Sequence, residues 1–330
     1  MIQDSRLKTQ DSRNVKIVFF GTSPVAVGVL DALKADGYLP ALIVTTPDAP
    51  AGRKLALKPP PAKLWALAND IPLLQPTKLN SELNYKLQTK NYQLFLVASY
   101  GKLIPKKLLG IPKHGTLNVH PSLLPKYRGP SPIQSAILNG DSETGVTIML
   151  MDEKMDEGPI LAEERVALNG TEVNEELELK LSTLGGHLLA RVIPDWLASR
   201  VEPRPQDHAQ ATYTHKFNKA NGLIDPHLLS LPSYGILQNS VGGIESESER
   251  ELRETTPPKS DSTAAEAAER MVRAFNPSPG TYTIITTKRG KQMRVKILSA
   301  SIRDDRLLPL RVIPEGKRET SWEEFVWRVR

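Results

Sequence analysis

Cysteine is absent from this chain of 330 residues, aromatic residues make up only 5% of it, and it has no long apolar run. Without cysteine there can be no disulfide, thiolate zinc site, iron–sulfur cluster or cysteine nucleophile, so any catalysis must use other side chains. The longest apolar stretches have the length of a β-strand, whereas a membrane helix requires about 20 residues. No membrane association is therefore expected. No signal-peptide core follows Met1, so a cytosolic-type chain is expected. Residues 1–14 contain two Asp and lack the acid-poor, Arg-rich pattern of an organellar transit peptide, so a bacterial cytoplasm is the default expectation and an organelle the less favoured one.

Two further groups of motifs are missing. Gly21-Thr22-Ser23-Pro24 follows an apolar run, but the chain has neither the GxGxxG fingerprint of dinucleotide-binding proteins nor a GxxxxGK[ST] phosphate loop. It also lacks the HExxH pair of zinc peptidases, and its six histidines are scattered. These absences disfavour NAD-dependent reactions and nucleotide hydrolysis, and we expect no metal site.

The residues that are present, 39% hydrophobic and 24% charged, are typical of a globular chain long enough for two domains. The net charge of +6 is unevenly distributed: residues 1–220 carry +4, residues 221–263 carry −4 and residues 264–330 carry +6. Two basic blocks around an acidic one suit a polyanionic partner, although modest basicity is also a common solubility feature.

Apolar runs that alternate with helical patterns define the first part of the chain. Val15 to Phe20 combines β-branched and aromatic residues and is followed by a glycine, as a buried strand is, and helical spacing runs from Val25 to Leu33. Further strands are predicted at residues 41–45, 94–98, 116–120 and 147–151, and a long helix at residues 174–200, which Pro194 kinks or ends. This alternation predicts an α/β fold with a mostly parallel sheet covered by helices on both faces.

The composition changes near residue 226. From Pro226 to Thr263, Ser, Glu, Pro and Gly dominate and periodicity is lost, which is typical of a disordered acidic insertion. Beyond it, a short helix and three strands predict a small second domain. The expected division is a first domain at residues 15–203, a linker at 204–225, the insertion at 226–263 and the second domain at 264–330.

Asn118 and His120 are the first candidate catalytic residues. They stand two apart at the end of a predicted strand, so their side chains point to the same face, and open α/β sheets bind ligands beyond the carboxyl ends of their strands. An amide that holds a developing oxyanion and an imidazole that moves a proton are a plausible pair for acyl-type transfer. Alone, such a pair is more often structural than catalytic.

A second segment, from Gly145 to Ile160, supplies carboxylates. It begins as a buried strand and continues as a loop that holds Asp152 and Asp156, and Gly158 permits a tight return. A carboxylate near His120 would orient the ring and stabilise its protonated form. Taken by itself this loop is ordinary, because loop aspartates usually only bind backbone donors.

Together, the two segments resemble the folate-dependent formyltransferase family. Its Asn-x-His-x-Ser-Leu-Leu-Pro stretch is matched at Asn118 to Pro125, and its GxTxxxxxxxxDxG stretch is matched from Gly145 to Gly158. Pro121 stands where many members have glycine. The resemblance implies a Rossmann-like α/β formyltransferase domain, a small and here shortened OB-like β-barrel domain, and transfer of a formyl group from 10-formyltetrahydrofolate to an acceptor amine.

The resemblance also implies roles for individual residues. Asn118 would hold the carbonyl oxygen, His120 would manage proton transfer, and Asp156 would support the imidazole. Backbone groups from Tyr100 to Ile104 would contact the pterin. The rest of the folate pocket would be lined by Ser122, Leu123, Leu124 and Pro125.

Features outside the motifs favour initiator methionyl-tRNA as the acceptor. A basic loop after the second strand carries Arg53 and Lys54, and Arg273 to Gly280 resembles the entry to the C-terminal domain of the tRNA-acting members. That domain carries Lys288, Arg289 and Lys317, which suit phosphate contacts. A nucleotide-sugar N-formyltransferase stays the alternative because its loops are related, and a non-catalytic RNA-binding module is disfavoured by the intact polar site. A monomer with tRNA and folate as partners is expected.

Overall fold

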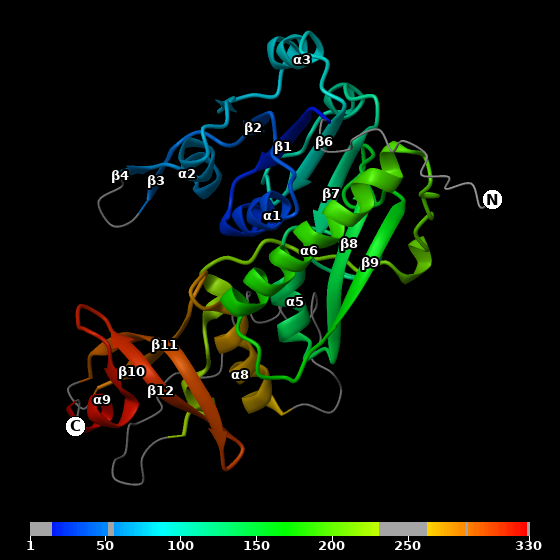
Figure 1. Cartoon of the computed structure of the whole chain (residues 1–330). Coiled ribbons are helices and arrows are strands. Elements are labelled where there is room, and N and C mark those ends of the chain that lie inside the picture. The colour runs from blue at the N-terminus through cyan, green and yellow to red at the C-terminus, as the bar shows by residue number, and fades with distance from the viewer. Residues whose placement is uncertain (1–14, 52–55, 231–262, 288–289, 329–330) are drawn as a thin grey trace. The chain divides into compact units, whose positions relative to one another are not determined.

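The computed structural model of the chain describes residues 15–51, 56–230, 263–287 and 290–328, drawn as a coloured ribbon in Figure 1. Contacts between residues divide it into two compact units that alternate along the sequence. The first unit takes in the chain up to Pro130, Thr144–Val166 and Glu178–Tyr213. The second takes in Ser131–Glu143, Ala167–Leu177 and the chain from Thr214 onward.

A seven-stranded sheet forms the centre of the first unit, with the strand order β5-β2-β1-β6-β7-β8-β9 (Figure 1). Neighbouring strands from β5 to β7 are parallel, and β8 is antiparallel to β7. The predicted α/β fold with a mostly parallel sheet is confirmed. The strands are β1 (Ile17–Gly21), β2 (Leu42–Val44), β5 (Leu73–Leu74), β6 (Leu94–Ala98), β7 (Thr116–His120), β8 (Glu143–Leu150) and β9 (Ile160–Ala167).

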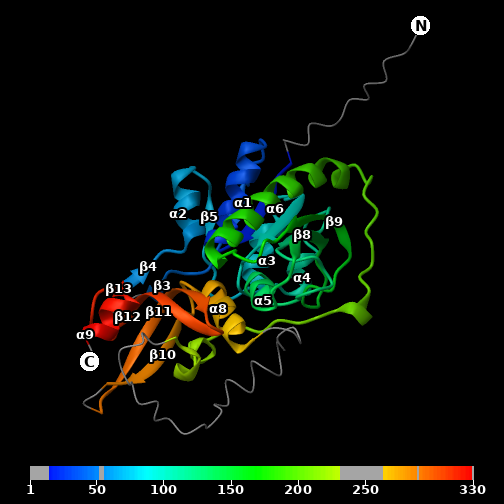
Figure 2. The ribbon, with the colours of Figure 1, turned by 90° about the horizontal axis from the view of Figure 1, so that it is seen from below.

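Helices α1 (Pro24–Ala35) and α6 (Asn174–Leu197) pack side by side against one face of this sheet (Figure 2). Two adjacent glycines of α6 allow the close approach. A Cβ on Gly185 would lie 2.5 Å from Val119 of β7, and a Cβ on Gly186 would lie 2.5 Å from the Cβ of Ala32 in α1. Pro194 does not end α6, which continues to Leu197. α2 (Pro61–Ala68) packs beside α1.

The opposite face of the sheet is covered by α3 (Ser81–Gln88) and α4 (Lys106–Leu109). Leu87 of α3 and Leu108 of α4 share a buried cluster with Phe20 and Phe95 of the central strands. Because β1 and β6 are fully buried along their length, their sequences are apolar without interruption, as parallel strands between two helical layers are.

The second unit contains a four-stranded antiparallel sheet in the order β10-β11-β12-β13. Val272 and Trp322, from the two flanking helices, are buried with Val295 and Ile297 of the sheet. The described strands place β10 and β13 at opposite edges, so they form a sheet and not a closed barrel. The elements are α5 (Pro132–Leu138), α8 (Ala264–Phe275), β10 (Thr281–Thr286), β11 (Gln292–Arg303), β12 (Arg306–Pro314), β13 (Thr320–Ser321) and α9 (Trp322–Arg328).

The first residues of the predicted acidic insertion are part of this second unit. Pro226–Leu228 form a short 3₁₀ turn, and Leu229 is 1% exposed within the same core. Ordered structure therefore extends beyond residue 226, and the rest of the insertion, residues 231–262, lies outside the described residues. In the described ranges no helix has the length and apolar character needed to cross a membrane.

Candidate active site

Strand β7 presents Asn118 and His120 on one face of the sheet. Val119 between them faces Gly185 of α6, so by the alternation of a strand both polar side chains point to the opposite face. Asn118 is 9% exposed and His120 is 4% exposed. The prediction that the two share a face is confirmed.

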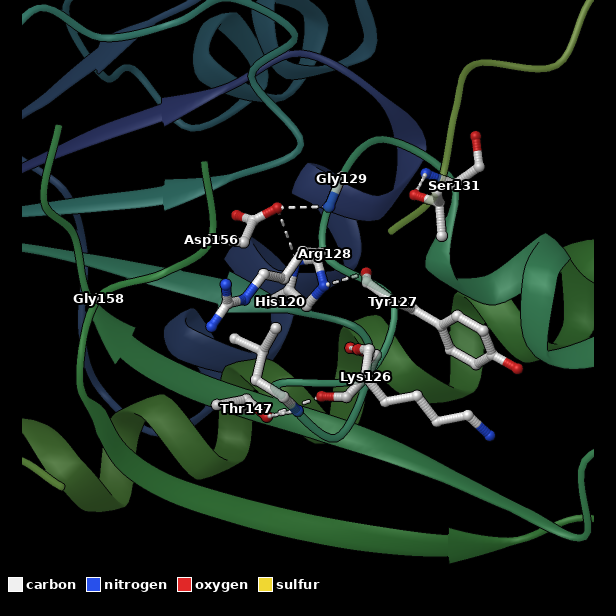
Figure 3. A network of polar contacts seen from close by, with 12 residues as sticks. His120, Lys126, Tyr127, Arg128, Gly129, Ser131, Thr147, Asp156 and Gly158 are labelled. Atoms are coloured by element: carbon white, nitrogen blue, oxygen red, sulfur yellow. Dashed lines mark hydrogen bonds and ion pairs between the residues drawn. The ribbon is translucent and has the colours of Figure 1, made fainter. Parts of the chain in front are cut away.

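The His120 ring has two different neighbours (Figure 3). Its Nε2 lies 3.0 Å from the carbonyl oxygen of Tyr127, and because a carbonyl can only accept, Nε2 carries the proton and donates it. Its Nδ1 lies 3.8 Å from Oδ2 of Asp156. Nδ1 is therefore the ring nitrogen that can take up a proton, and a carboxylate stands near it to stabilise the imidazolium.

Asp156 lies in the loop between β8 and β9. Its backbone has φ +54°, a left-handed conformation that aspartate tolerates better than most residues, and its Oδ2 accepts a 2.8 Å hydrogen bond from the Gly129 amide. At Gly158 the loop passes too close to β8 for any other residue, because a Cβ there would lie 1.9 Å from the carbonyl oxygen of Leu150. The loop thus returns past β8 with the carboxylate held at His120.

The side-chain amide of Asn118 makes no hydrogen bond within the part of the chain that the structure describes. A largely buried amide normally has partners, because leaving a donor unpaired costs free energy. Its two N–H donors are thus available to an incoming oxygen beside His120. The geometry suits a reaction in which a carbonyl oxygen gains negative charge while a neighbouring proton moves.

The turn that follows β7 is held by Thr147 of β8. Its hydroxyl donates to the carbonyl oxygen of Ser122 at 2.7 Å and accepts from the amide of Leu124 at 3.1 Å. The Ser122 hydroxyl donates within the turn to the carbonyl of Lys126, and Leu124 packs with Met149 in a small buried cluster. Leu123 and Pro125 are half-buried. Contact of these four residues with folate stays a prediction.

Tyr100 follows β6 at the same edge of the sheet. Its ring packs edge-on against Phe20 with centroids 5.5 Å apart, and burial raises the pKa of its phenol to about 12. Its carbonyl oxygen accepts a 2.9 Å hydrogen bond from the Thr22 hydroxyl, which ties the segment after β6 to the segment after β1. The predicted pterin contact of Tyr100 to Ile104 stays a prediction.

The predicted tRNA-binding residues are only partly described. Arg53, Lys54, Lys288 and Arg289 lie outside the described residues. Lys317 is exposed on the turn between β12 and β13.

The hairpin that carries Arg53 and Lys54, β3 (Ala49–Ala51) and β4 (Ala56–Lys58), begins next to Asp48. Both carboxylate oxygens of Asp48 accept from Lys63 of α2 at 2.8 Å, and one also accepts from Gln75 at 2.8 Å. The hydrogen bonds from Lys63 and Gln75 lower the pKa of Asp48, and the bond from Lys63 has the larger effect.

Sequence reasoning assigned no role to Arg128 and Gln206. Arg128 is 0% exposed and Gln206 is 6% exposed, and the pair lies beside the Asp156 loop. Arg128 stands three residues after the motif from Asn118 to Pro125, and this closeness to the motif is a signal in the sequence, whereas nothing in the local pattern around Gln206 distinguishes it. Among the described residues no cluster of three or more metal-ligating side chains is found.

Comparison with protein families gives two matches. The formyl transferase model matches residues 15–193, and the model of the formyl transferase C-terminal domain matches residues 262–309. The two matches together span both the site around His120 and the β10–β12 region of the second unit.

Individual relatives agree with the family models. A methionyl-tRNA formyltransferase from Chloroflexus aurantiacus is 39% identical over 91% of this chain and 84% of its own length. Another from a Geobacillus species is 43% identical over 64% of this chain and 67% of its own length. The crystal structure of a 4-N formyltransferase from Francisella tularensis superimposes with a TM-score of 0.56 over 87% of this chain and 99% of that one, at 19% identity, which shows a shared fold.

Proposed function

The chain belongs to the formyl transferase family, and from that premise we propose that it transfers the formyl group of 10-formyltetrahydrofolate to the amino group of initiator methionyl-tRNA. The observation that carries this choice of acceptor is the 39% identity to a methionyl-tRNA formyltransferase along 91% of the chain, through both units. The X-ray structure of a sugar N-formyltransferase from a Shewanella species shares the fold at only 15% identity, so a nucleotide sugar is the less supported acceptor.

The residues of the site divide the work of the transfer. 10-Formyltetrahydrofolate carries its formyl group on N10. The acceptor amine attacks the formyl carbon, and the bond between that carbon and N10 breaks. Asn118 donates its free amide hydrogens to the formyl oxygen as that oxygen gains charge, an interaction worth about 3 kcal/mol of barrier in acyl transfer. The absence of a protein partner for this amide among the described residues fits an oxygen ligand there.

Proton movement falls to His120. Its Nε2 is bonded to the Tyr127 carbonyl, so Nδ1 takes the proton that leaves the attacking amine and returns one to the departing N10. The carboxylate of Asp156, 3.8 Å from Nδ1, stabilises the imidazolium during that interval.

The second unit supplies a surface that suits RNA phosphates. On β11, Arg294 stacks over the ring of Tyr282 of β10, with its guanidinium carbon 3.6 Å from the ring centroid, and Lys296 follows on the same face of the strand. Lys317 is exposed on the turn after β12. We assign Arg53, Lys54, Lys288, Arg289 and Lys317 to tRNA backbone contacts, which give affinity without sequence readout.

The test is a direct comparison of acceptors. Purified full-length protein is mixed with 10-formyltetrahydrofolate and either methionyl-tRNA or an amino-sugar nucleotide, with the His120→Ala variant as the blank. Formylation of methionyl-tRNA that the variant lacks is the expected result. Transfer to the sugar nucleotide alone would replace the proposal by its alternative. We further infer that the protein is a monomer and works in the bacterial cytoplasm. Light scattering of the protein alone and with tRNA measures its mass and so tests the oligomeric state.

A further inference from the structure

Gln206 is bonded to both ends of the short segment that contains Asp156. Its Nε2 donates to the carbonyl oxygen of Asp156 at 2.9 Å and to that of Gly158 at 2.7 Å. Both hydrogens of the amide are therefore used on this one loop. Gln206 comes from the segment expected to be a linker, and it lies within the same compact unit as the site.

Arg128 sets the orientation of that amide. Oε1 of Gln206 accepts from Nε of Arg128 at 3.1 Å and from Nη2 at 2.8 Å. A flipped amide would place N–H donors against a guanidinium that has only donors, so the observed orientation is the one that satisfies both groups. The rest of the guanidinium contacts Tyr213, His208 and Glu157.

The backbone on either side of Arg128 reaches the two catalytic side chains. The carbonyl of Tyr127 holds Nε2 of His120, and the amide of Gly129 holds the carboxylate of Asp156. The amide of Arg128 in turn donates to the carbonyl of Thr212 at 2.8 Å. One anchor, made by Arg128 and Gln206, thus serves both the segment that fixes the imidazole and the loop that carries the carboxylate.

We propose that Gln206 is a positioning residue for formyl transfer: its two N–H donors hold the Asp156 loop so that the carboxylate stays beside Nδ1 of His120. This rests on the proposed function for its catalytic consequence. The competing role is purely structural, in which Gln206 only supplies an acceptor to the buried guanidinium of Arg128. The two roles use opposite ends of the same amide, and a substitution can separate them.

Gln206→Glu makes that separation. A carboxylate keeps an acceptor for Arg128, and strengthens it by charge, but it offers no N–H donors to the carbonyls of Asp156 and Gly158. The positioning role predicts that kcat falls on the order of 10²-fold while KM for folate and tRNA is unchanged, because a small misplacement of a catalytic group costs about that much. Gln210→Glu, the same change on an exposed residue nearby, is the control and retains kcat.

A readout without substrate keeps this inference separate from the proposed function. The Gly129 amide donates to Asp156, so its hydrogen exchange in the full chain should become about tenfold faster in Gln206→Glu if the carboxylate is released, and should not change in Gln210→Glu. Normal kcat and unchanged Gly129 exchange in Gln206→Glu would overturn the proposal. If that variant fails to fold, the double variant Arg128→Met/Gln206→Met, which leaves no buried cation without an acceptor, is compared by the same two criteria with Arg128→Met alone, which keeps both N–H donors of Gln206. A wild-type protein that formylates no tRNA would refute the proposed function alone, since the exchange measurement still decides the role of Gln206 in holding Asp156.

Discussion

Nε2 of His120 donates a hydrogen bond to the carbonyl oxygen of Tyr127 across 3.0 Å. The partner is a backbone carbonyl, so this bond holds the ring in the same tautomer whichever side chain stands at position 127. It leaves Nδ1, on the side of Asp156, as the nitrogen that exchanges protons. The consequences of this arrangement can be measured.

His120→Ala should lower kcat by about 10²- to 10⁴-fold, the range that general acid–base groups supply. The matched control is His187→Ala, which removes an exposed histidine of α6 paired with Asp36 and should retain wild-type turnover. Single-turnover formylation measures both, with far-UV circular dichroism to confirm the fold. Equal turnover by the two variants would contradict the assigned role of His120.

Asn118→Leu should lower kcat by about 10²- to 10³-fold, the loss that follows removal of an oxyanion donor. Its melting temperature should stay close to that of the wild type, because the amide makes no hydrogen bond among the described residues and its removal leaves no partner unpaired. Calorimetry measures the melting temperature and formylation kinetics measure kcat, both on the same preparation of Asn118→Leu. A large loss of stability with normal kcat would assign Asn118 to the core instead.

Gly158→Ala should weaken both stability and activity. Its Cβ would lie 1.9 Å from the carbonyl oxygen of Leu150, so the Asp156 loop must move, at a cost of about 1–3 kcal/mol. Gly110→Ala, where the nearest atom to the new Cβ is 3.7 Å away, should change little. Urea unfolding midpoints of the two variants give the comparison, and equal midpoints would show that the loop accommodates the methyl group.

Tyr100 should make stability fall in alkali. Burial raises the pKa of its phenol to about 12 in the folded state, whereas the unfolded chain ionises near pH 10. Between pH 10 and pH 12 the unfolded state releases a proton that the folded state keeps. The contribution of Tyr100 to the free energy of unfolding, about 3 kcal/mol, is therefore present below pH 10 and lost toward pH 12. Unfolding of the wild type and Tyr100→Phe from pH 9 to pH 12 measures it. If the difference in free energy of unfolding between the wild type and Tyr100→Phe does not change with pH, the raised pKa of Tyr100 is disproved.

Asp48→Asn should raise KM for tRNA and leave KM for folate unchanged, because it loosens the base of the hairpin that carries Arg53 and Lys54. The hydrogen bonds from Lys63 and then Gln75 lower the pKa of Asp48. The anchor is therefore complete at neutral pH and weakens only as the pH falls through that lowered pKa. Asp70→Asn, an exposed change elsewhere in the same unit, is the control. Parallel rises in both KM values would argue for a general loss of fold.

The strands were the most predictable part of the structure. Leu94–Ala98 and Thr116–His120 are found where predicted, since uninterrupted apolar runs are what a sheet buried on both faces requires. The sequence predicts a helix over residues 174–200 that Pro194 kinks or ends, and the second outcome is wrong: α6 continues past Pro194 to Leu197, because packing of a long helix against a sheet can outweigh the loss of one hydrogen bond.

The candidate site was predictable only where its residues are close in sequence. Asn118 and His120 share a strand, and the strand period alone puts them on one face. Gln206 meets the Asp156 loop from 50 positions further along the chain, and no local pattern of hydrophobicity or turn residues carries that information. Long-range hydrogen bonds of this kind depend on how the chain returns to the sheet, which only the folded structure specifies.

The segment that bears Gln206 and Thr212 determines how the protein can be dissected. A recombinant fragment ending at residue 193 or 203 would lack Gln206, the acceptor for two hydrogen bonds from the fully buried guanidinium of Arg128. A buried cation deprived of an acceptor is strongly destabilising, so such a fragment is a poor choice for expression or crystallisation. An excision of the first unit should instead retain the chain through Tyr213, where that unit ends.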